Sequence, residues 1–245
     1  MLAPSPDMPA SALRVSDITA GFGGQKVLRG VSIEVAQGSL VTLIGPNGHG
    51  KTTLLRCISG LMRPWSGQIF LGDSEITDLK PHKIVERGVT HIPQGDLIFP
   101  DMTVYDNLMM GAYLPGAYAK AERKLAEVYE LLPRLRERAG QVASTLSGGE
   151  RRMLSIGRGL MGDGTLLMLD EPSLGLAPLV IDQIYGVIRD LKSRGLSILV
   201  VEENASRAME VGDWVYLLDD GKIVWQGEPA GMMENEEILA TYLGG

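Results

Sequence analysis

The stretch GPNGHGKTT at residues 45–53 decides the fold, because it fits the pattern G-x-x-x-x-G-K-[ST]. It lies between an apolar run of strand length, residues 40–44, and a stretch of helical character, residues 52–59. Its glycines permit a tight loop whose backbone N–H groups turn toward phosphate oxygens, and a helix N-terminus favours anions through its dipole. The alternative is a glycine-rich turn that binds nothing, and the strand, the lysine and the threonine together argue against it.

The loop predicts a binding site for the phosphates of ATP. Lys51 is expected to reach the β and γ phosphates, and the hydroxyl of Thr52 is expected to complete the shell of a Mg²⁺ ion. His49 occupies a variable position of the loop and is expected to point outward. The nucleotide-binding residues predicted here are Gly45, Pro46, Asn47, Gly48, His49, Gly50, Lys51, Thr52 and Thr53.

An acidic motif, LLMLDEPS, follows at residues 166–173. The apolar run 166–169 predicts a buried strand, and its carboxyl end places Asp170 beside the phosphate loop of a parallel sheet. We expect Asp170 to hold Mg²⁺ through its water shell and Glu171 to polarise the attacking water. An Asp-Glu-Pro turn after any core strand is the alternative. Taken alone, the two interpretations are equally good, but the upstream phosphate loop favours the metal site.

A third motif, LSGGE at residues 146–150, precedes a helical stretch expected at 150–161. It is a second helix N-terminus suited to phosphate, and one nucleotide rarely needs two from one chain. We therefore expect it to serve the nucleotide of a partner chain. With the three motifs in this order, the sequence strongly resembles the ATP-binding subunits of ABC transporters from about residue 13 onward. The nucleotide-binding residues predicted in this motif are Ser147, Gly148, Gly149 and Glu150.

The resemblance implies roles for three further segments. Phe22 stands where the family stacks an aromatic ring on adenine, although it could equally be a packing residue. Gln94 resembles the glutamine that contacts Mg²⁺ and the water, although a loop glutamine is usually only solvated. The segment SLGL at 173–176 resembles one that crosses the dimer interface, or it is an ordinary loop. The predicted catalytic residues are Glu171, Gln94 and Lys51, and the predicted metal residues are Thr52, Gln94 and Asp170.

One position departs from the family. The apolar strand expected at 197–201 runs into EEN at 202–204, so that Glu203 stands where most of the family has a histidine that touches the γ-phosphate. A carboxylate there would be repelled by about 1 to 4 kcal/mol at about 4 Å, so we expect it to turn away or to be protonated. We infer that Glu171, Lys51 and Gln94 suffice for hydrolysis, and that any chemistry from this position comes from a partner subunit.

The fold class expected is α/β, a P-loop NTPase core of the ABC type with a mainly parallel sheet. Residues 1–12 read as a disordered proline-containing tail, and residues 13–245 as one ATPase domain. Alternation over 31–35 predicts a half-buried strand, which in this family belongs to an N-terminal antiparallel β portion. The charged, alanine-containing run at 117–132 indicates helices, so an inserted helical subdomain is placed at about 95–142.

Net charge and the lengths of the apolar runs indicate the cellular location of the protein and the class of its partners. The net charge of −7 argues against a nucleic-acid partner. No apolar run approaches the ~18 residues of a membrane span, and the N-terminus lacks the features of a signal peptide. We therefore expect a cytoplasmic protein, peripheral on the inner face of the cell membrane. Cys57 is the single cysteine and is expected in the core, and the three histidines lack the spacing of metal ligands.

The segments 91–108, 169–178, 201–204 and 238–245 look like those of branched-chain amino acid importers, specifically their second ATPase subunit. Urea and short-amide importers share the pattern, so the cargo cannot be chosen. The resemblance implies a second ABC ATPase subunit as a homo- or heterodimer partner, transmembrane permease subunits and, indirectly, a substrate-binding protein. The apolar residues 97–99 either form a groove for a partner helix or close the subdomain core, with equal weight.

Two other functions stay open. A soluble ABC ATPase of a cytoplasmic assembly, such as an iron-sulfur scaffold, would use the same motifs on a partner outside the membrane. A nucleotide-binding regulatory subunit with weak turnover is a third interpretation. Glu203 is the only hint of it, and intact Lys51, Asp170 and Glu171 argue against it.

Overall fold

The computed structural model describes residues 10–203, 209–235 and 238. The apolar runs form a six-stranded sheet in which neighbouring strands are parallel, except that the edge strand β10 is antiparallel to β9. This confirms the predicted mainly parallel sheet. In sheet order the strands are β10 (Lys222–Gly227), β9 (Trp214–Asp219), β3 (Leu40–Ile44), β8 (Ser197–Glu202), β7 (Leu166–Asp170) and β6 (Val89–Ile92).

The central strands are buried on both faces. Every residue of β3 and β7 is buried. Leu166 and Met168 pack into the cluster that includes α1 (Lys51–Ile58), whereas Leu167 and Leu169 pack into the cluster on the opposite face. Such strands read as continuous apolar runs. Polar side chains therefore come where these strands end, at the carboxyl edge of the sheet.

A second, antiparallel sheet has the order β2-β1-β4-β5; β1 and β2 precede the phosphate loop, as expected, whereas β4 and β5 follow α1. The strand predicted at 31–35 is the inner part of the longer β2. β1 begins at Ser11, so that residues 11 and 12 are strand rather than tail, and residues 1–9 of the expected tail lie outside the described residues, as do residue 204 and residues 239–245. The strands are β1 (Ser11–Phe22), β2 (Gln25–Ala36), β4 (Ser66–Leu71) and β5 (Ser74–Glu75).

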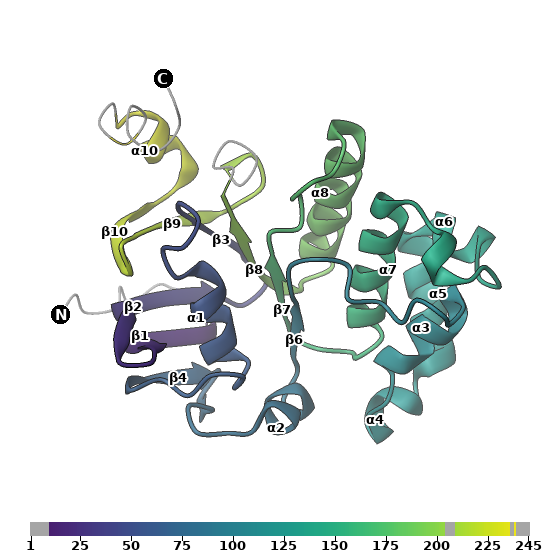
Figure 1. Cartoon of the computed structure of the whole chain (residues 1–245), viewed down its shortest axis with the longest axis horizontal. Coiled ribbons are helices and arrows are strands. Elements are labelled where there is room, and N and C mark those ends of the chain that lie inside the picture. Colours follow the sequence, from purple (N-terminus) through teal and green to yellow (C-terminus); the bar gives the residue numbers. More distant parts are fainter. Residues whose placement is uncertain (1–9, 204–208, 236–237, 239–245) are drawn as a thin grey trace.

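The helices divide between the two faces of the parallel sheet. α1 lies between the two sheets, while α7 and α8 cover the other face and α3, α5 and α6 gather against α7 (Figure 1). Helices α3 to α6 fall inside the range 95–142 proposed for the helical subdomain, whose boundaries stay a prediction. Besides α1, the helices are α2 (Pro81–Glu86), α3 (Val104–Gly111), α4 (Pro115–Tyr118), α5 (Ala121–Leu131), α6 (Pro133–Glu137), the 3-10 turn η1 (Ala143–Thr145), α7 (Gly148–Leu160), α8 (Pro178–Ser193) and α10 (Pro229–Met233).

Side-chain chemistry explains where α7 begins. The Ser147 hydroxyl accepts the backbone N–H of Glu150, and the Glu150 carboxylate accepts the N–H of Ser147, which forms a capping box. The helix therefore starts at Gly148, two residues before the predicted start. A Cβ on Gly149 would lie 2.7 Å from Val180 of α8, so glycine is needed where these two helices approach.

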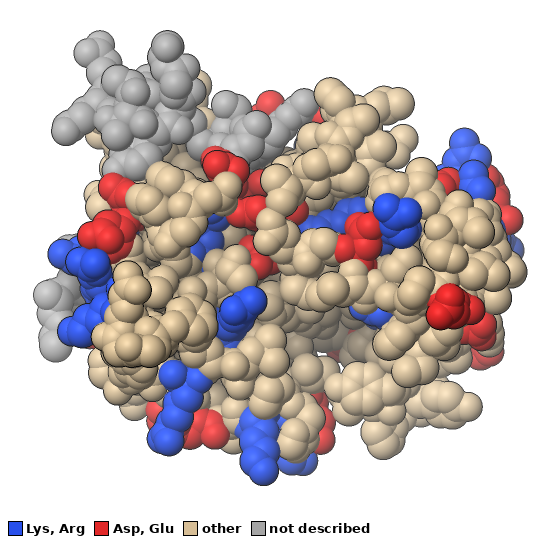
Figure 2. Space-filling model, viewed as in Figure 1, with Lys and Arg blue, Asp and Glu red and all other residues tan. Residues whose placement is uncertain are grey.

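The distribution of charged side chains on the surface and the burial of the single cysteine follow the expectations from composition. Acidic and basic side chains are interspersed over the face shown in Figure 2. Cys57 is buried in α1 as expected, and burial raises the pKa of its thiol to about 12. Among the described residues, no helix is both long enough and apolar enough to cross a membrane.

His91 of β6 is a partly buried base with an incomplete set of hydrogen bonds. Its Nδ1 lies 3.2 Å from the Ser59 hydroxyl at the end of α1, and its Nε2 is buried without a hydrogen-bond partner among the described residues. Burial, with a smaller effect from the charge of Arg56, lowers the pKa of His91 to about 4.

We predict that the free energy of unfolding falls as the pH decreases from about 6.5 toward about 4, because unfolded His91 takes up a proton that the folded side chain resists. Urea unfolding at a series of pH values measures this dependence. His91→Gln should flatten it, whereas His82→Gln, which changes an exposed histidine of α2, should not. Equal pH dependence in wild type and His91→Gln would contradict the assignment.

Candidate functional site

The phosphate loop connects β3 to α1, and its conformation requires glycine at specific positions. Gly50 caps α1 with φ 110°, and a Cβ on it would lie 2.7 Å from Leu28 Cδ2. A Cβ on Gly45 would lie 2.1 Å from the Leu218 carbonyl oxygen. Gly48 has φ 84° but faces open space. The first two glycines thus allow close packing, and the third allows a left-handed turn at the open side of the loop.

Lys51 lies inside this loop with only 4% of its surface exposed. Its Nζ donates hydrogen bonds to the carbonyl oxygens of Gly45 (2.8 Å) and Pro46 (3.2 Å) and to Asn47 Oδ1 (3.3 Å). It also lies 3.4 Å from Glu171 Oε1. The ammonium group is therefore held at the centre of the loop, with a carboxylate that compensates its charge.

A cavity of about 320 Å³ brings the predicted catalytic residues together. It joins the phosphate loop to the segments that follow β6 and β7. The predicted site residues that do not line it are Phe22, Gly45, Pro46, His49, Asp170, Ser147, Gly148, Gly149 and Glu150. The lining residues are Asn47, Gly48, Gly50, Lys51, Thr52, Thr53, Gln94, Glu171 and Leu174.

Gln94 and Glu171 form a hydrogen-bonded pair at this cavity. Gln94 Nε2 donates to Glu171 Oε2 at 2.9 Å. Glu171 has φ 45°, a left-handed conformation that costs a non-glycine residue about 1 to 3 kcal/mol and that surrounding contacts must maintain. Its backbone N–H donates to the Val201 carbonyl at 2.9 Å, which ties it to β8. The side chain is thus held 6% exposed, facing Lys51 and Gln94.

Asp170 and Thr52 fit a Mg²⁺ ion. The Thr52 hydroxyl donates to Asp170 Oδ1 at 3.3 Å, while Oδ2 of this fully buried carboxylate has no hydrogen-bond partner among the described residues. Burial raises the pKa of Asp170, against the lowering effect of Thr52. An orphan buried carboxylate oxygen beside a hydroxyl suits a hard cation with oxygen ligands. The amide of Gln94 is engaged by Glu171, so its role toward a metal stays a prediction.

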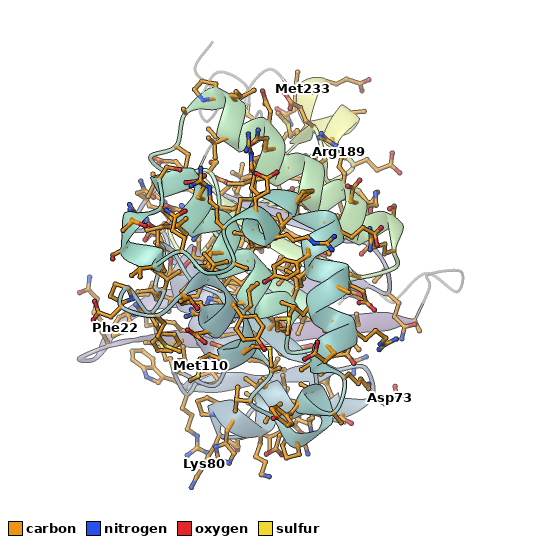
Figure 3. The ribbon with its side chains drawn as sticks, turned by 90° about the vertical axis from the view of Figure 1, so that its right-hand side faces the viewer. Phe22, Asp73, Lys80, Met110, Arg189 and Met233 are labelled. Atoms are coloured by element: carbon orange, nitrogen blue, oxygen red, sulfur yellow. The ribbon has the colours of Figure 1, made fainter. Side chains whose placement is uncertain are left out.

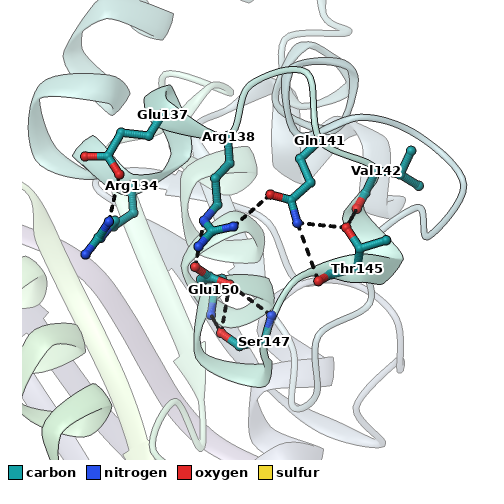
Figure 4. A network of polar contacts seen from close by, with 8 residues as sticks. All are labelled: Arg134, Glu137, Arg138, Gln141, Val142, Thr145, Ser147 and Glu150. Atoms are coloured by element: carbon teal, nitrogen blue, oxygen red, sulfur yellow. Dashed lines mark hydrogen bonds and ion pairs between the residues drawn. The ribbon is translucent and has the colours of Figure 1, made fainter.

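The LSGGE motif lies at the N-terminus of α7, where its carboxylate is fully engaged (Figure 4). The Ser147 backbone N–H and hydroxyl each donate to Glu150 Oε2 at 2.9 Å, and Arg138 Nε lies 2.8 Å from Glu150 Oε1. The Ser147 backbone N–H is the main cause that holds the pKa of Glu150 below its usual value. Since this motif does not line the cavity, its predicted role toward a partner's nucleotide remains a prediction.

Phe22 lies apart from the cavity at the end of β1. Its side chain is 50% exposed and lies at the outer edge of the molecule in Figure 3. A Cβ on the preceding Gly21 would lie 1.9 Å from the Gln25 carbonyl oxygen, so this turn holds Phe22 at a defined position. Its exposure leaves the ring free to stack, and adenine stacking remains a prediction.

The structure gives the neighbours of two residues whose side-chain direction was predicted. His49 Nδ1 lies 2.6 Å from Asp219 Oδ1 at the end of β9, the strand next to β3, and His49 does not line the cavity. Glu203 Oε2 accepts a hydrogen bond from Asn47 Nδ2 at 2.8 Å, and its orientation toward a γ-phosphate stays a prediction. Strand β8 also neighbours β3, which places the residue after β8 beside the phosphate loop.

Sequence reasoning missed three buried polar residues around the site. Glu202 accepts hydrogen bonds from the Tyr185 hydroxyl (2.9 Å) and the Ser173 N–H (3.2 Å), and burial raises its pKa. Asn107 hydrogen-bonds both backbone groups of Phe99. Arg152 of α7 is buried against the catalytic loops. The only sequence signal was for Glu202, an acidic residue that directly follows an all-apolar strand.

The fold and the site together define a nucleotide-binding ATPase of the P-loop class. Residues 28–174 match the ABC transporter family. The chain therefore belongs to this family and is an ABC transporter ATP-binding subunit that hydrolyses ATP.

Known proteins of this family resemble the chain over almost its whole length. It is 40% identical over 233 residues to the high-affinity branched-chain amino acid transport ATP-binding protein BraG of Pseudomonas aeruginosa, covering 95% of this chain and 100% of that protein. It is 34% identical over 239 residues to the lipopolysaccharide export system ATP-binding protein LptB of Haemophilus influenzae, covering 96% and 98%. The ADP conformation of MJ1267, an ATP-binding cassette of an ABC transporter, has a TM-score of 0.85 at 28% identity and covers 96% of this chain and 99% of that chain.

We predict that Asp170→Asn stabilises the nucleotide-free protein while it removes Mg²⁺-dependent turnover. The substitution removes an unpaired buried charge, so the melting temperature should rise by a few degrees without metal or nucleotide. ATP hydrolysis with Mg²⁺ should fall about 100-fold or more, because a neutral amide is a weaker ligand for a hard cation. Thermal melts and a phosphate-release assay measure the two effects.

Asp73→Asn is the matched control, because Asp73 is exposed in the turn between β4 and β5 and does not line the cavity. It should change neither quantity. A destabilised Asp170→Asn protein with normal turnover would rule out the metal assignment.

Proposed function

We propose that the chain is the ATP-binding and hydrolysing subunit of an ABC importer for branched-chain amino acids, which powers transport through partner permease subunits. The observation that carries the ATPase part is the single cavity lined by the phosphate loop, Gln94 and Glu171. The 40% identity to BraG over the whole length of that protein supports the cargo class.

The site residues divide the chemistry of hydrolysis among them. Lys51 binds the β and γ phosphates of ATP, to which its Nζ can turn from the carbonyl oxygens that it now contacts. Glu171 accepts the proton of the attacking water, which Gln94 helps to orient, since their side chains are already joined at 2.9 Å. Thr52 and Asp170 hold Mg²⁺, which when bound neutralises phosphate charge.

Glu203 has no step in this scheme. Its carboxylate is bound to the Asn47 amide at the edge of the loop, and Asn47 in turn accepts a hydrogen bond from Lys51. This arrangement orients the loop rather than the water. Turnover therefore rests on Glu171, Gln94 and Lys51.

The second half of the working site comes from another ATPase subunit. Ser147 and the N-terminus of α7 present a hydroxyl and free backbone N–H groups, yet they do not line this chain's own cavity. A head-to-tail dimer, of two copies or of this chain with a related subunit, would place them on the partner's ATP. Closure on ATP and reopening after hydrolysis then shift the attached permease between two arrangements.

We predict that Glu171→Gln produces a dimer that forms only with ATP. The amide keeps the size of the side chain but cannot accept the proton, so that ATP stays intact between the subunits. Size-exclusion chromatography with light scattering would show the doubled mass. The double variant Lys51→Ala/Glu171→Gln should remain monomeric, and a Glu171→Gln protein that stays monomeric when saturated with ATP would contradict the homodimer.

The surface after Gln94 supports docking of a permease. Leu97 and Phe99 are 62% and 42% exposed and are available to a partner helix, whereas Ile98 packs against the core. Asn107 clamps the backbone of Phe99, and the guanidinium of Arg158 lies 5.0 Å from the centre of its ring. A rigid apolar surface joined to Gln94 suits contact with a helix of a membrane subunit.

We predict that Phe99→Asp releases the membrane partner without weakening ATP binding. A charge at the centre of an apolar contact remains desolvated and unpaired when the partner binds. The tagged chain is purified from detergent-solubilised native membranes, and the bound proteins are identified by mass spectrometry. Wild type should retain polytopic permeases and a second ATPase, and the variant should lose the permeases.

Val224→Asp is the control, because Val224 is 52% exposed on the edge strand β10, on another part of the molecule. It should retain the permeases. Recovery of soluble partners alone with the wild-type chain would instead favour an ATPase of a cytoplasmic assembly.

The same subunit could serve export, and this is the second candidate. The 34% identity to LptB of Haemophilus influenzae supports it, at a lower level than the identity to BraG. In either case the subunit is peripheral on the cytoplasmic face of the membrane. The permeases recovered with the chain would decide between the two directions, and an importer would also require a substrate-binding protein.

A further inference from the structure

Arg152 is a buried cation whose hydrogen bonds all go to backbone. It lies on α7 with 3% of its surface exposed. Burial of an unpaired charge is costly, so a guanidinium inside a protein needs a partner for each N–H group. Arg152 makes five hydrogen bonds with its five N–H donors, each to a carbonyl oxygen. The side chain is therefore fully satisfied by the loops around it.

Those carbonyl oxygens belong to the two loops that carry Gln94 and Glu171. Two of them flank Gln94, and the other three are those of Glu171 and its two neighbours. The bonds run from Nη1 to Pro93 O (3.0 Å) and Gly95 O (2.7 Å), from Nη2 to Asp170 O (2.9 Å) and Glu171 O (3.0 Å), and from Nε to Pro172 O (3.3 Å).

Both loops contain a residue with a left-handed backbone conformation, which glycine adopts freely but which is strained at Glu171. Glu171 has φ 45° and Gly95 has φ 84°. A left-handed conformation at Glu171 persists only when surrounding contacts maintain it. The carbonyl oxygen of each of these two residues accepts a hydrogen bond from the Arg152 guanidinium, which therefore joins the two segments directly.

We propose that Arg152 is a positioning residue for hydrolysis, which holds the backbones of the Gln94 and Glu171 loops in register so that the side chains of the two residues meet. The inference rests on the proposed roles of Gln94 and Glu171. Arg152 itself does not line the cavity. It acts through the carbonyl groups of the segments that bear the catalytic side chains.

Only a side chain with forked donors, such as a guanidinium, can reach the carbonyl oxygens of both loops. The acceptors lie in two separate loops, and Nη1 and Nη2 serve one loop each. A lysine places three donors on a single atom and cannot span both sets of carbonyls. A glutamine amide has two donors and reaches fewer still. Either replacement should loosen one loop from the other while α7 remains.

The first test is amide hydrogen exchange on the full chain, which needs no turnover. In R152K and R152Q, exchange should become about tenfold faster or more at residues 94–96 and 171–174 together. Residues 48–54 of the phosphate loop and α1, which Arg152 does not contact, should keep the wild-type rate. Unchanged exchange in the two loops, or faster exchange throughout the protein, would overturn the proposal.

The second test separates positioning from a general loss of structure. R152K should lower kcat for ATP about tenfold or more, while the dissociation constant for ATP changes less than about twofold. In a double-mutant cycle with Gln94→Ala, R152K should cost less than about a further twofold, because it acts through the same residue. Additive losses, or weaker ATP binding in place of a lower kcat, would contradict it.

Arg123→Lys on α5 is the matched control, because Arg123 is 64% exposed and its ion pair with Glu127 is confined to the helix surface. It should leave exchange and kinetics unchanged. Failure of both R152K and R152Q to fold would overturn the proposal in favour of a purely structural role. If the wild-type chain does not hydrolyse ATP, the proposed function fails, while the exchange result still decides whether Arg152 holds the two loops.

Discussion

Burial of the parallel strands on both faces is the constraint on which this structure depends. β3, β7 and β8 are buried along their whole length, so that most of their side chains are apolar and belong to the core. Polar groups can enter only where these strands stop, and parallel pairing makes them stop at one edge. The phosphate loop, Asp170 and Glu202 all lie at that edge, and Gln94 follows β6 there. The site is thus a consequence of the sheet.

The sequence predicted those parts of the site that depend on a short pattern. Glycine spacing and the apolar run before it define the phosphate loop, and a carboxylate after an apolar strand identifies Asp170 and Glu171. The start of α7 differed by two residues, because a capping box decides where that helix begins, whereas β2 begins six residues before the predicted strand. The helices at 104–137 were anticipated from their local pattern, and the antiparallel sheet was implied by the family resemblance.

The remaining features depend on contacts between segments far apart in the chain. Arg152 and Asn107 bind backbone atoms of other loops, and any residue type can supply a backbone carbonyl, so no pattern marks the partner. The contacts of His49 and Glu203 require knowledge that β9 and β8 both flank β3. Periodicity describes which face of an element is buried, but it does not give the order of strands in a sheet. That order determines which residues the side chains of His49 and Glu203 contact.

The hydrogen bonds of Lys51 within the loop affect how readily the nucleotide product is released. The ammonium group already has partners in the loop's own carbonyl oxygens, the Asn47 amide and the Glu171 carboxylate. Arrival of a phosphate therefore exchanges one set of contacts for another, and only the difference between the sets contributes to affinity. When the nucleotide leaves, Lys51 again forms its hydrogen bonds to the loop, so its buried ammonium group is not left unpaired. Because the loop's own acceptors compete with phosphate for Lys51, they favour rapid release of the nucleotide, which the subunit needs after every cycle.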